Sequence, residues 1–237
     1  MIISHSNRFI FLANRKTAST SIGIAFSSCC SQKDVIAPLG RDEKIRRELG
    51  YPCPRNYIPW QSLPAHIGLR LRRKLAGKPI ERDLKKISYH THITAAQVLE
   101  YLPRRHWDSC FRFCFVRNPW DRAISHYFWT TRSQPEPISL DQFIEGKQLR
   151  NAAEKSRAIY SLNGEIAVHR LCQFENAQSE VNRIFEELNL SGNPLLPETK
   201  RQFRSDRRHY REVLNDNQAA RIATIFDREI ALAGYTY

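Results

Sequence analysis

The stretch from Phe9 to Ile22 constrains the fold of this chain more than any other. It begins with five apolar residues, Phe9 to Ala13, and such a continuous run is typical of a strand buried on both faces. A polar turn follows, and apolar residues recur at helical spacing from Ile22, which predicts a helix that begins within the turn. The first N–H groups of a helix lack intrahelical partners and carry partial positive charge. This strand, turn and helix therefore predict an anion site.

The turn supplies the side chains that an anion site needs. Lys16 contributes a full positive charge, and small hydroxyl side chains follow it at Thr17, Ser19, Thr20 and Ser21. A hydroxyl-rich helix start can also be a simple N-cap, so the turn alone leaves both interpretations open. The phosphate loop of nucleotide kinases, G-x-x-x-x-G-K-[ST], has two glycines before its lysine, and this turn has none.

Length and composition predict one globular domain, residues 1–237. The 41% hydrophobic and 11% aromatic content excludes a disordered chain. No apolar run is long enough to cross a membrane and no signal-peptide pattern is present, so we expect a cytoplasmic protein or a domain detached from its anchor. None of the six cysteines forms a C-x-x-C pair, which favours buried free thiols over a zinc site.

The net charge of +13 raises the possibility of anionic partners. It is compatible with nucleic acid, an anionic membrane surface, or an anionic ligand and acceptor. The cations gather in two runs, residues 70–74 and 200–211, and such runs are commonly solvated faces. Between residues 33 and 86, proline and glycine interrupt the chain repeatedly. We expect an irregular insertion there that binds the acceptor, with short helices near 42–49 and 65–75.

A second strand–helix junction follows in the middle of the chain. Residues 110–116 read as a buried strand, and Arg117 stands at its end, where α/β sheets bind ligands. Asn118 is a good N-cap and Pro119 fits the first helical position, so a helix is predicted there with Ser125 two turns in. Farther on, we expect a helix over 138–149, a strand over 166–174, a helix around 181–188 and a last helix over 217–232.

Two histidines lie between these junctions. If residues 87–93 are extended, His90 and His92 share a face, because side chains alternate along a strand. No third metal ligand lies nearby in the sequence, so a metal pair is disfavoured against a structural, hydrogen-bonded histidine. Thr94 then predicts the N-cap of a helix.

Three of these segments, in this order, resemble a known family. Lys-Thr-Ala-Ser-Thr-Ser at 16–21 resembles the 5′-phosphosulfate loop of sulfotransferases that use 3′-phosphoadenosine 5′-phosphosulfate (PAPS), closest to heparan sulfate 2-O-sulfotransferases and related carbohydrate sulfotransferases. Residues 115–127 resemble the 3′-phosphate motif, with Arg117 and Ser125 eight residues apart. Residues 89–94 resemble the segment that holds the catalytic histidine, at His92. Arg15 stands where the family commonly has proline.

The resemblance implies an α/β fold: a single domain with a central, mainly parallel sheet flanked by helices, a P-loop-like sulfotransferase fold. It implies PAPS as co-substrate, no metal, and a carbohydrate or other hydroxyl acceptor, which can itself be anionic. His92 would be the general base and Lys16 would stabilise charge on the departing phosphate. The residues assigned to donor binding are Arg15, Lys16, Thr17, Ala18, Ser19, Thr20, Ser21, Arg117 and Ser125.

Several alternatives remain at this stage. A nucleotide-dependent kinase, a basic nucleic-acid-binding module and a pseudoenzyme that binds the nucleotide without turnover are the competing functions, and Arg15 keeps the last one open. Glu43 or Glu81 could replace His92 as base. With a histidine base, we expect the rate to fall as pH drops through about 6.5. The sequence indicates neither the acceptor's identity nor the oligomeric state.

Overall fold

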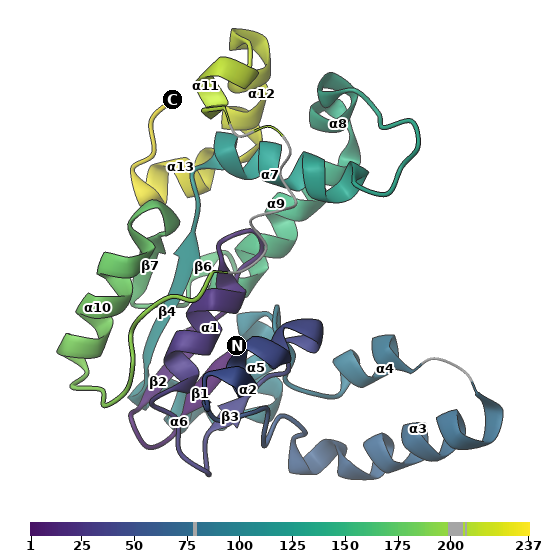
Figure 1. Cartoon of the computed structure of the whole chain (residues 1–237), viewed down its shortest axis with the longest axis vertical. Helices are drawn as coiled ribbons and strands as arrows, with labels where there is room; N and C mark the ends of the chain where they lie inside the picture. Colours follow the sequence, from purple (N-terminus) through teal and green to yellow (C-terminus); the bar gives the residue numbers. More distant parts are fainter. Residues whose placement is uncertain (78–79, 199–205, 207) are drawn as a thin grey trace.

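A five-stranded sheet lies at the centre of the described part of the molecule. The computed structural model describes residues 1–77, 80–198, 206 and 208–237. The strands run in the order β3–β1–β2–β4–β7 (Figure 1). They are β1 (Ile2–Ser4), β2 (Phe9–Leu12), β3 (Val35–Ile36), β4 (Phe111–Val116) and β7 (Arg170–Gln173), and a separate hairpin joins β5 (Ser161–Leu162) to β6 (Glu165–Ile166).

The three strands that position the candidate site are parallel. Leu12 of β2 pairs with Cys114 of β4, and Val116 of β4 pairs with Gln173 of β7. Their carboxyl ends therefore meet at one side of the sheet, which we call the sheet edge. The predicted α/β class with a central, mainly parallel sheet is confirmed. The antiparallel extension through β1 and β3 was not predicted.

The helices account for most of the remaining described chain. They are α1 (Ser19–Ser27), α2 (Glu43–Glu48), α3 (Leu63–Ala76), α4 (Glu81–Lys86), α5 (Ala95–Tyr101), α6 (Arg104–Ser109), α7 (Pro119–Thr131), α8 (Leu140–Glu145), α9 (Lys147–Tyr160), α10 (Ala177–Glu187), α11 (Tyr210–Val213), α12 (Asp216–Ile225) and α13 (Asp227–Ala233). The predicted caps are present. Thr94 forms a capping box with Gln97, and the Asn118 side chain accepts from two N–H groups of α7.

Two predicted helices and one predicted strand are each divided. Gly146 has extended backbone angles and separates α8 from α9, while Phe226 separates α12 from α13. The strand predicted over 166–174 is wrong in its first half. Asn163 and Gly164 both have positive φ, which is the backbone of a type I′ hairpin turn, so Ile166 belongs to β6 and the central strand begins only at Arg170.

Alternation along β2 gives each face of the sheet its own core. Phe9 and Phe11 point to one face, where they pack with Phe26 of α1 and Phe185 of α10. Ile10 and Leu12 point to the other face, which is covered by residues of α5, α7, α9 and α12. Because both faces are covered, the polar end of β2 is accessible only at the sheet edge.

Helices α3 and α4 extend away from the sheet and form what we call the arm, residues 60–77 and 80–86 (Figure 1). The predicted short helices near 42–49 and 65–75 correspond to α2 and α3. Val35 and Ile36, near the start of the predicted insertion, instead pair with β1 in the sheet.

Two sequence expectations stay open after the fold is known. Among the described residues, no helix is both long and apolar enough to cross a membrane, and the cytoplasmic location stays a prediction. Much of the predicted basic run at 200–211 lies outside the described residues, namely 200–205 and 207.

Candidate active site

The loop between β2 and α1 has the backbone of a tight turn. Lys16 and Ala18 both have left-handed backbone angles, with φ of 63° and 49°. Such angles are uncommon for residues other than glycine, and they recur in backbone concavities that bind anions. The carbonyl of Ala18 accepts from Ile22 N at 3.1 Å, and α1 begins at Ser19, within the hydroxyl-rich run, as predicted.

The first turn of α1 consists of residues with hydroxyl side chains. Ser19, Thr20 and Ser21 are all buried, and no acidic side chain lies in this turn. Thr17 is also buried, and its Oγ1 donates to the carbonyl of Asn14 at 3.2 Å. The positive end of the helix dipole therefore lies among buried hydroxyl side chains, with no competing carboxylate from its own turn.

Lys16 is placed by a residue that the sequence analysis did not single out. Its Nζ lies 4.9 Å from the centre of the Trp129 ring on α7. This distance is within the range of a cation–π contact, which attracts the ammonium group to the ring face. Trp129 therefore restricts the lysine side chain to the α7 side of the turn.

Arg117 connects the two predicted phosphate loops directly. Its Nη1 donates to the carbonyl of Lys16 at 3.2 Å and to the Ser125 Oγ at 3.4 Å. The Asp121 carboxylate accepts from Nε at 2.7 Å, and the ring of Phe174 lies 4.6 Å from the guanidinium carbon. Several contacts thus fix the guanidinium. Through it, Lys16, which lies 101 residues away in sequence, and Ser125, which lies 8 residues away, are brought to one place.

Sheet topology explains why these motifs meet. β2 leads into the Lys16 turn and β4 leads into Arg117, and the two strands are parallel neighbours. Glu175, just after β7, accepts from Asn118 N at 2.7 Å and from the Tyr235 hydroxyl at 2.9 Å. Three successive strand ends are therefore connected at the sheet edge, which is where α/β sheets bind ligands.

His92 lies at the end of β2, beside the same turn. Its Nδ1 is 2.8 Å from the carbonyl oxygen of Ala13. A carbonyl can only accept, so Nδ1 carries the proton and Nε2 keeps a lone pair. Burial lowers the pKa of His92 to about 3, and the positive charge of Arg15 adds to the decrease. The imidazole is accordingly neutral and able to accept a proton at Nε2.

The reasoning that gave His90 and His92 a shared face was wrong. Residues 87–94 form turns and a bend between α4 and α5, with Ile93 N donating to the carbonyl of His90 at 3.3 Å, so strand alternation does not apply. Burial also lowers the pKa of His90 to about 4. The sequence analysis missed a third histidine, His126, whose pKa is lowered to about 4 by burial and then by the charge of Lys16. Its position directly after Ser125 could have identified it.

Comparison with known proteins decides the family. A family model described as the sulfotransferase family, family 2, matches residues 1–236. The chain belongs to the sulfotransferase family. It is therefore a sulfuryl-transferring enzyme and not a nucleotide-dependent kinase, and enzymes of this family generally use PAPS as donor. No curated protein and no solved structure matched the chain.

In this sulfotransferase, Asn14 compensates for the arginine that replaces the common proline. Arg15 has a backbone N–H that proline lacks, and Asn14 Oδ1 accepts from it at 2.7 Å. The same oxygen accepts from the Ser156 hydroxyl of α9 at 2.5 Å, and both side chains are fully buried. Asn14 Nδ2 is buried with no hydrogen-bond partner among the described residues, which leaves a donor at the base of the turn.

Glu43 and Glu81 are the two carboxylates considered as alternative bases. Glu43 is held in place: it accepts from Leu39 N at 2.5 Å and from the buried Arg46 at 3.0 Å. Its carboxylate is therefore already engaged by partners within the protein. The side chain of Glu81 lies outside the described residues.

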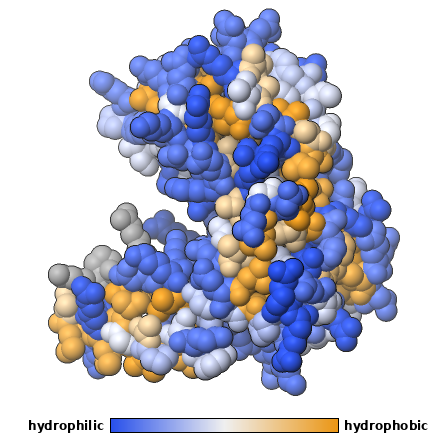
Figure 2. Space-filling view, turned by 180° about the vertical axis from the view of Figure 1, so that it is seen from behind, coloured by the Kyte–Doolittle hydropathy of each residue, from blue (hydrophilic) through white to orange (hydrophobic). Residues whose placement is uncertain are grey.

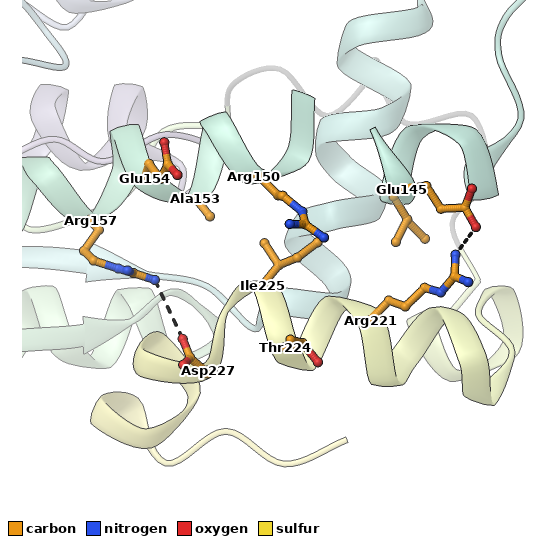
Figure 3. Close-up of a pocket in the computed structure, with 10 residues that line it drawn as sticks. Glu145, Arg150, Ala153, Glu154, Arg157, Arg221, Thr224, Ile225 and Asp227 are labelled. Atoms are coloured by element: carbon orange, nitrogen blue, oxygen red, sulfur yellow. Dashed lines mark hydrogen bonds and ion pairs between the residues drawn. The ribbon is translucent and has the colours of Figure 1, made fainter. Parts of the chain in front are cut away.

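A hollow of about 530 Å³ lies between α9 and the α12–α13 pair, and none of the predicted site residues lines it (Figure 3). Arg157 and Asp227 face each other across it at 3.8 Å, and Arg221 pairs with Glu145. Cations and carboxylates are balanced on its walls.

A metal site or a disulfide would require suitable side chains to lie close together among the described residues. No group of three or more His, Cys, Asp or Glu side chains there is placed to hold a metal ion. All six cysteines are free, as the sequence predicted, and four of them are buried.

Proposed function

We propose that this sulfotransferase transfers the sulfuryl group of PAPS to a hydroxyl of a carbohydrate acceptor, with His92 as general base. The observation that carries the proposal is the position of Arg117. Its Nη1 lies within hydrogen-bond distance of both the Lys16 carbonyl and the Ser125 hydroxyl. One cation therefore connects the two loops that a donor with phosphates at both ends would span.

The residues present fit such a donor. The first turn of α1, with buried hydroxyls and no acidic neighbour in the turn, suits the 5′-phosphosulfate. Arg117 and Ser125 suit the 3′-phosphate, because a guanidinium and a hydroxyl both donate to phosphate oxygens. The buried, unpartnered Nδ2 of Asn14 offers a further donor near the turn.

PAPS supplies a sulfuryl group whose departure leaves negative charge on a phosphate oxygen. Lys16 and the N-terminus of α1 stabilise that charge as it develops, which lowers the barrier more than it strengthens ground-state binding. The contact between Lys16 and Trp129 keeps the ammonium group beside the turn. The closeness of Lys16 to Arg117 couples charge stabilisation to donor binding.

His92 takes the proton from the acceptor hydroxyl at Nε2. The hydrogen bond from Nδ1 to the Ala13 carbonyl selects the tautomer with a free Nε2 lone pair and fixes the ring beside the turn. A positioned general base contributes roughly 10²–10⁴-fold to the rate. Glu43 is less suitable because Arg46 and Leu39 N already occupy its carboxylate.

The acceptor is proposed to bind in the hollow between the arm and the body of the protein. Figure 2 shows this hollow, with mainly hydrophilic residues on its visible walls. Residues 33–86, which include the arm, would supply one wall and act as the acceptor-binding insertion of a single domain, 1–237. Polar walls and a net charge of +13 favour a sugar hydroxyl, on a polymer that can itself carry anionic groups.

Donor binding is tested with adenosine 3′,5′-bisphosphate, which should raise the melting temperature because it binds the folded state. Arg117→Ala should weaken binding by about 1.5–3 kcal/mol, the range for hydrogen bonds to a charged group. A nucleotide without the 3′-phosphate is the matched control. Equal stabilisation by both nucleotides would count against the proposed donor.

The acceptor is tested by incubating the enzyme and PAPS with a panel of glycans and, in parallel, with non-carbohydrate alcohols and phenols, and detecting products by mass spectrometry. A sulfate adduct on a sugar, absent with Lys16→Ala, supports the proposal. Donor consumption together with sulfate adducts only on non-carbohydrate hydroxyls would retain the donor and overturn the acceptor.

A further inference from the structure

Helix α3 has an apolar stripe with no partner in the described structure. Leu63, Ile67, Leu71 and Leu75 are spaced by four residues, which places them along one side of the helix, and they are between 46% and 86% exposed. Trp60, in the turn that leads into the helix, is 77% exposed. Only His66 of α3 is buried.

This stripe differs from the rest of the described surface. The other large exposed hydrophobic residues occur singly, at Leu49, Ile166, Leu195 and Leu232. Isolated apolar residues are normal on a surface, whereas a contiguous set marks an interaction site. Figure 2 shows apolar residues gathered along the outer side of the arm, while its side toward the hollow is mainly hydrophilic.

The charges of α3 are all positive. The helix contains Arg70, Arg72, Arg73 and Lys74 and no acidic residue. At about 100° per residue, Arg72 lies on one flank of the stripe, and Arg70 and Lys74 lie on the other. An apolar stripe with cations on both flanks is complementary to a surface that is apolar below and anionic above.

We propose that α3, together with Trp60, docks on the surface of an anionic phospholipid membrane. The stripe enters the boundary between headgroups and acyl chains, and the flanking cations contact lipid phosphates. At 14 residues the helix is too short to span a bilayer and lies in its plane. Tryptophan favours this boundary, which accounts for an exposed ring at the start of the helix.

The charge pattern favours lipid over a second copy of the chain. Pairing two α3 stripes would bring their flanking cations together, and like charges at an interface oppose association. The inference is also independent of the proposed donor binding and catalysis, because none of the residues proposed for either belongs to α3, and the acceptor wall is assigned to the hydrophilic side of the arm and not to the stripe (Figure 2).

The test is vesicle flotation of the full chain at low and moderate salt. The probes are vesicles of phosphatidylcholine alone and vesicles with about 30% phosphatidylglycerol, an anionic lipid that attracts cationic segments. We expect binding to the anionic vesicles, weaker binding as salt rises, and little binding to the neutral ones. Hydrogen exchange of the unmodified chain should show protection over 63–76 when anionic vesicles are added.

Variants separate the two parts of the surface. Ile67→Ser with Leu71→Ser removes the centre of the stripe and should lower vesicle binding at least about tenfold, since each buried CH₂ contributes to partitioning. Arg70→Gln with Lys74→Gln should lower binding to anionic vesicles by about fivefold per cation removed. The matched controls, Leu195→Gln and Arg105→Gln, alter exposed residues elsewhere and should leave binding unchanged.

Three results of the vesicle experiments would overturn the proposal. They are no binding of the unmodified chain to anionic vesicles, equal binding by the stripe variant, or protection that falls outside 63–76. A dimer by light scattering that the stripe variant converts to monomer would assign the stripe to self-association instead. Stripe-dependent binding to an acidic protein without binding to lipid would likewise replace the membrane as partner.

Discussion

Helices α3 and α9 have the same length, 14 residues, but opposite relations to the fold. Leu149, Ile159 and Tyr160 of α9 are each at most 1% exposed, whereas the apolar stripe of α3 is largely exposed. α9 packs beside the sheet edge, where Ser156 holds Asn14 at the base of the Lys16 turn. An amphipathic pattern thus predicts a helix in both places, but only the surrounding fold decides whether its apolar side is core or surface.

This difference divides the molecule into a buried region that holds chemical groups in place and an exposed region open to partners. At the sheet edge, Asn14, Arg117 and His92 each have hydrogen-bond partners from another segment of the chain. On the arm, the side chains of the stripe are between 46% and 86% exposed. Substitutions at the sheet edge should therefore change catalysis, and substitutions within the outward-facing stripe of α3 should change neither turnover nor stability.

The largest effect is expected at His92. His92→Ala should lower kcat by at least about 10²-fold while donor binding is retained, because it removes the proton acceptor and not a phosphate contact. His90→Ala is the matched control and should lose less. Steady-state kinetics with a thermal shift by adenosine 3′,5′-bisphosphate checks both. Near-normal turnover of His92→Ala would place the base elsewhere, and Glu81 would then be the next residue to test.

Lys16 should follow. Lys16→Ala should lower kcat by about 10²–10³-fold and raise the KM for PAPS by less, because its charge acts mainly in the transition state. Lys16→Arg should restore only part of the rate, since a planar guanidinium does not replace a compact ammonium in a tight turn. A variant with full kcat and a raised KM alone would show that Lys16 binds ground state and transition state equally.

The pH profile should differ from that of a solvent-exposed histidine. Burial lowers the pKa of His92 to about 3, so the base stays neutral through pH 6.5, and kcat/KM, which reports the free enzyme, should fall only at lower pH.

Folding stability should respond to pH in a higher range than catalysis does. The unfolded chain binds the proton near pH 6.5 and the folded chain does not, so stability is lost as pH falls below 6.5. Unfolding of His92→Gln, followed against pH, should show a shallower loss.

The smallest effect is expected on the arm. Leu71→Ala should change the free energy of unfolding by less than about 0.5 kcal/mol, the usual limit for exposed sites. Leu149→Ala on α9 should cost about 2–5 kcal/mol, because it leaves a cavity in the core. Urea unfolding compares the two. A cost above about 1 kcal/mol for Leu71→Ala would mean that the stripe packs within the protein in solution.

Much of the fold and of the site's membership was readable from local signals. The apolar runs at 9–13 and 110–116 predicted β2 and β4, and Thr94 and Asn118 marked helix starts. These signals are visible in sequence because they depend on neighbours along the chain. Strands of three and two residues, such as β1 and β3, contain too few positions for a period to show, so the antiparallel side of the sheet was missed.

Contacts between distant segments were decided by the tertiary structure alone. The hydrogen bond of His92 to Ala13 spans 79 residues, and that of Arg117 to Lys16 spans 101. The role of Asn14 depends on Ser156 of a helix 142 residues away. The sequence by itself determined which residue types stand at the ends of β2 and β4. The parallel pairing of these strands brought the ends together, and the absence of a covering element in the described fold left the stripe of α3 exposed. Both outcomes depend on which distant segments pack together, and no local pattern encodes that.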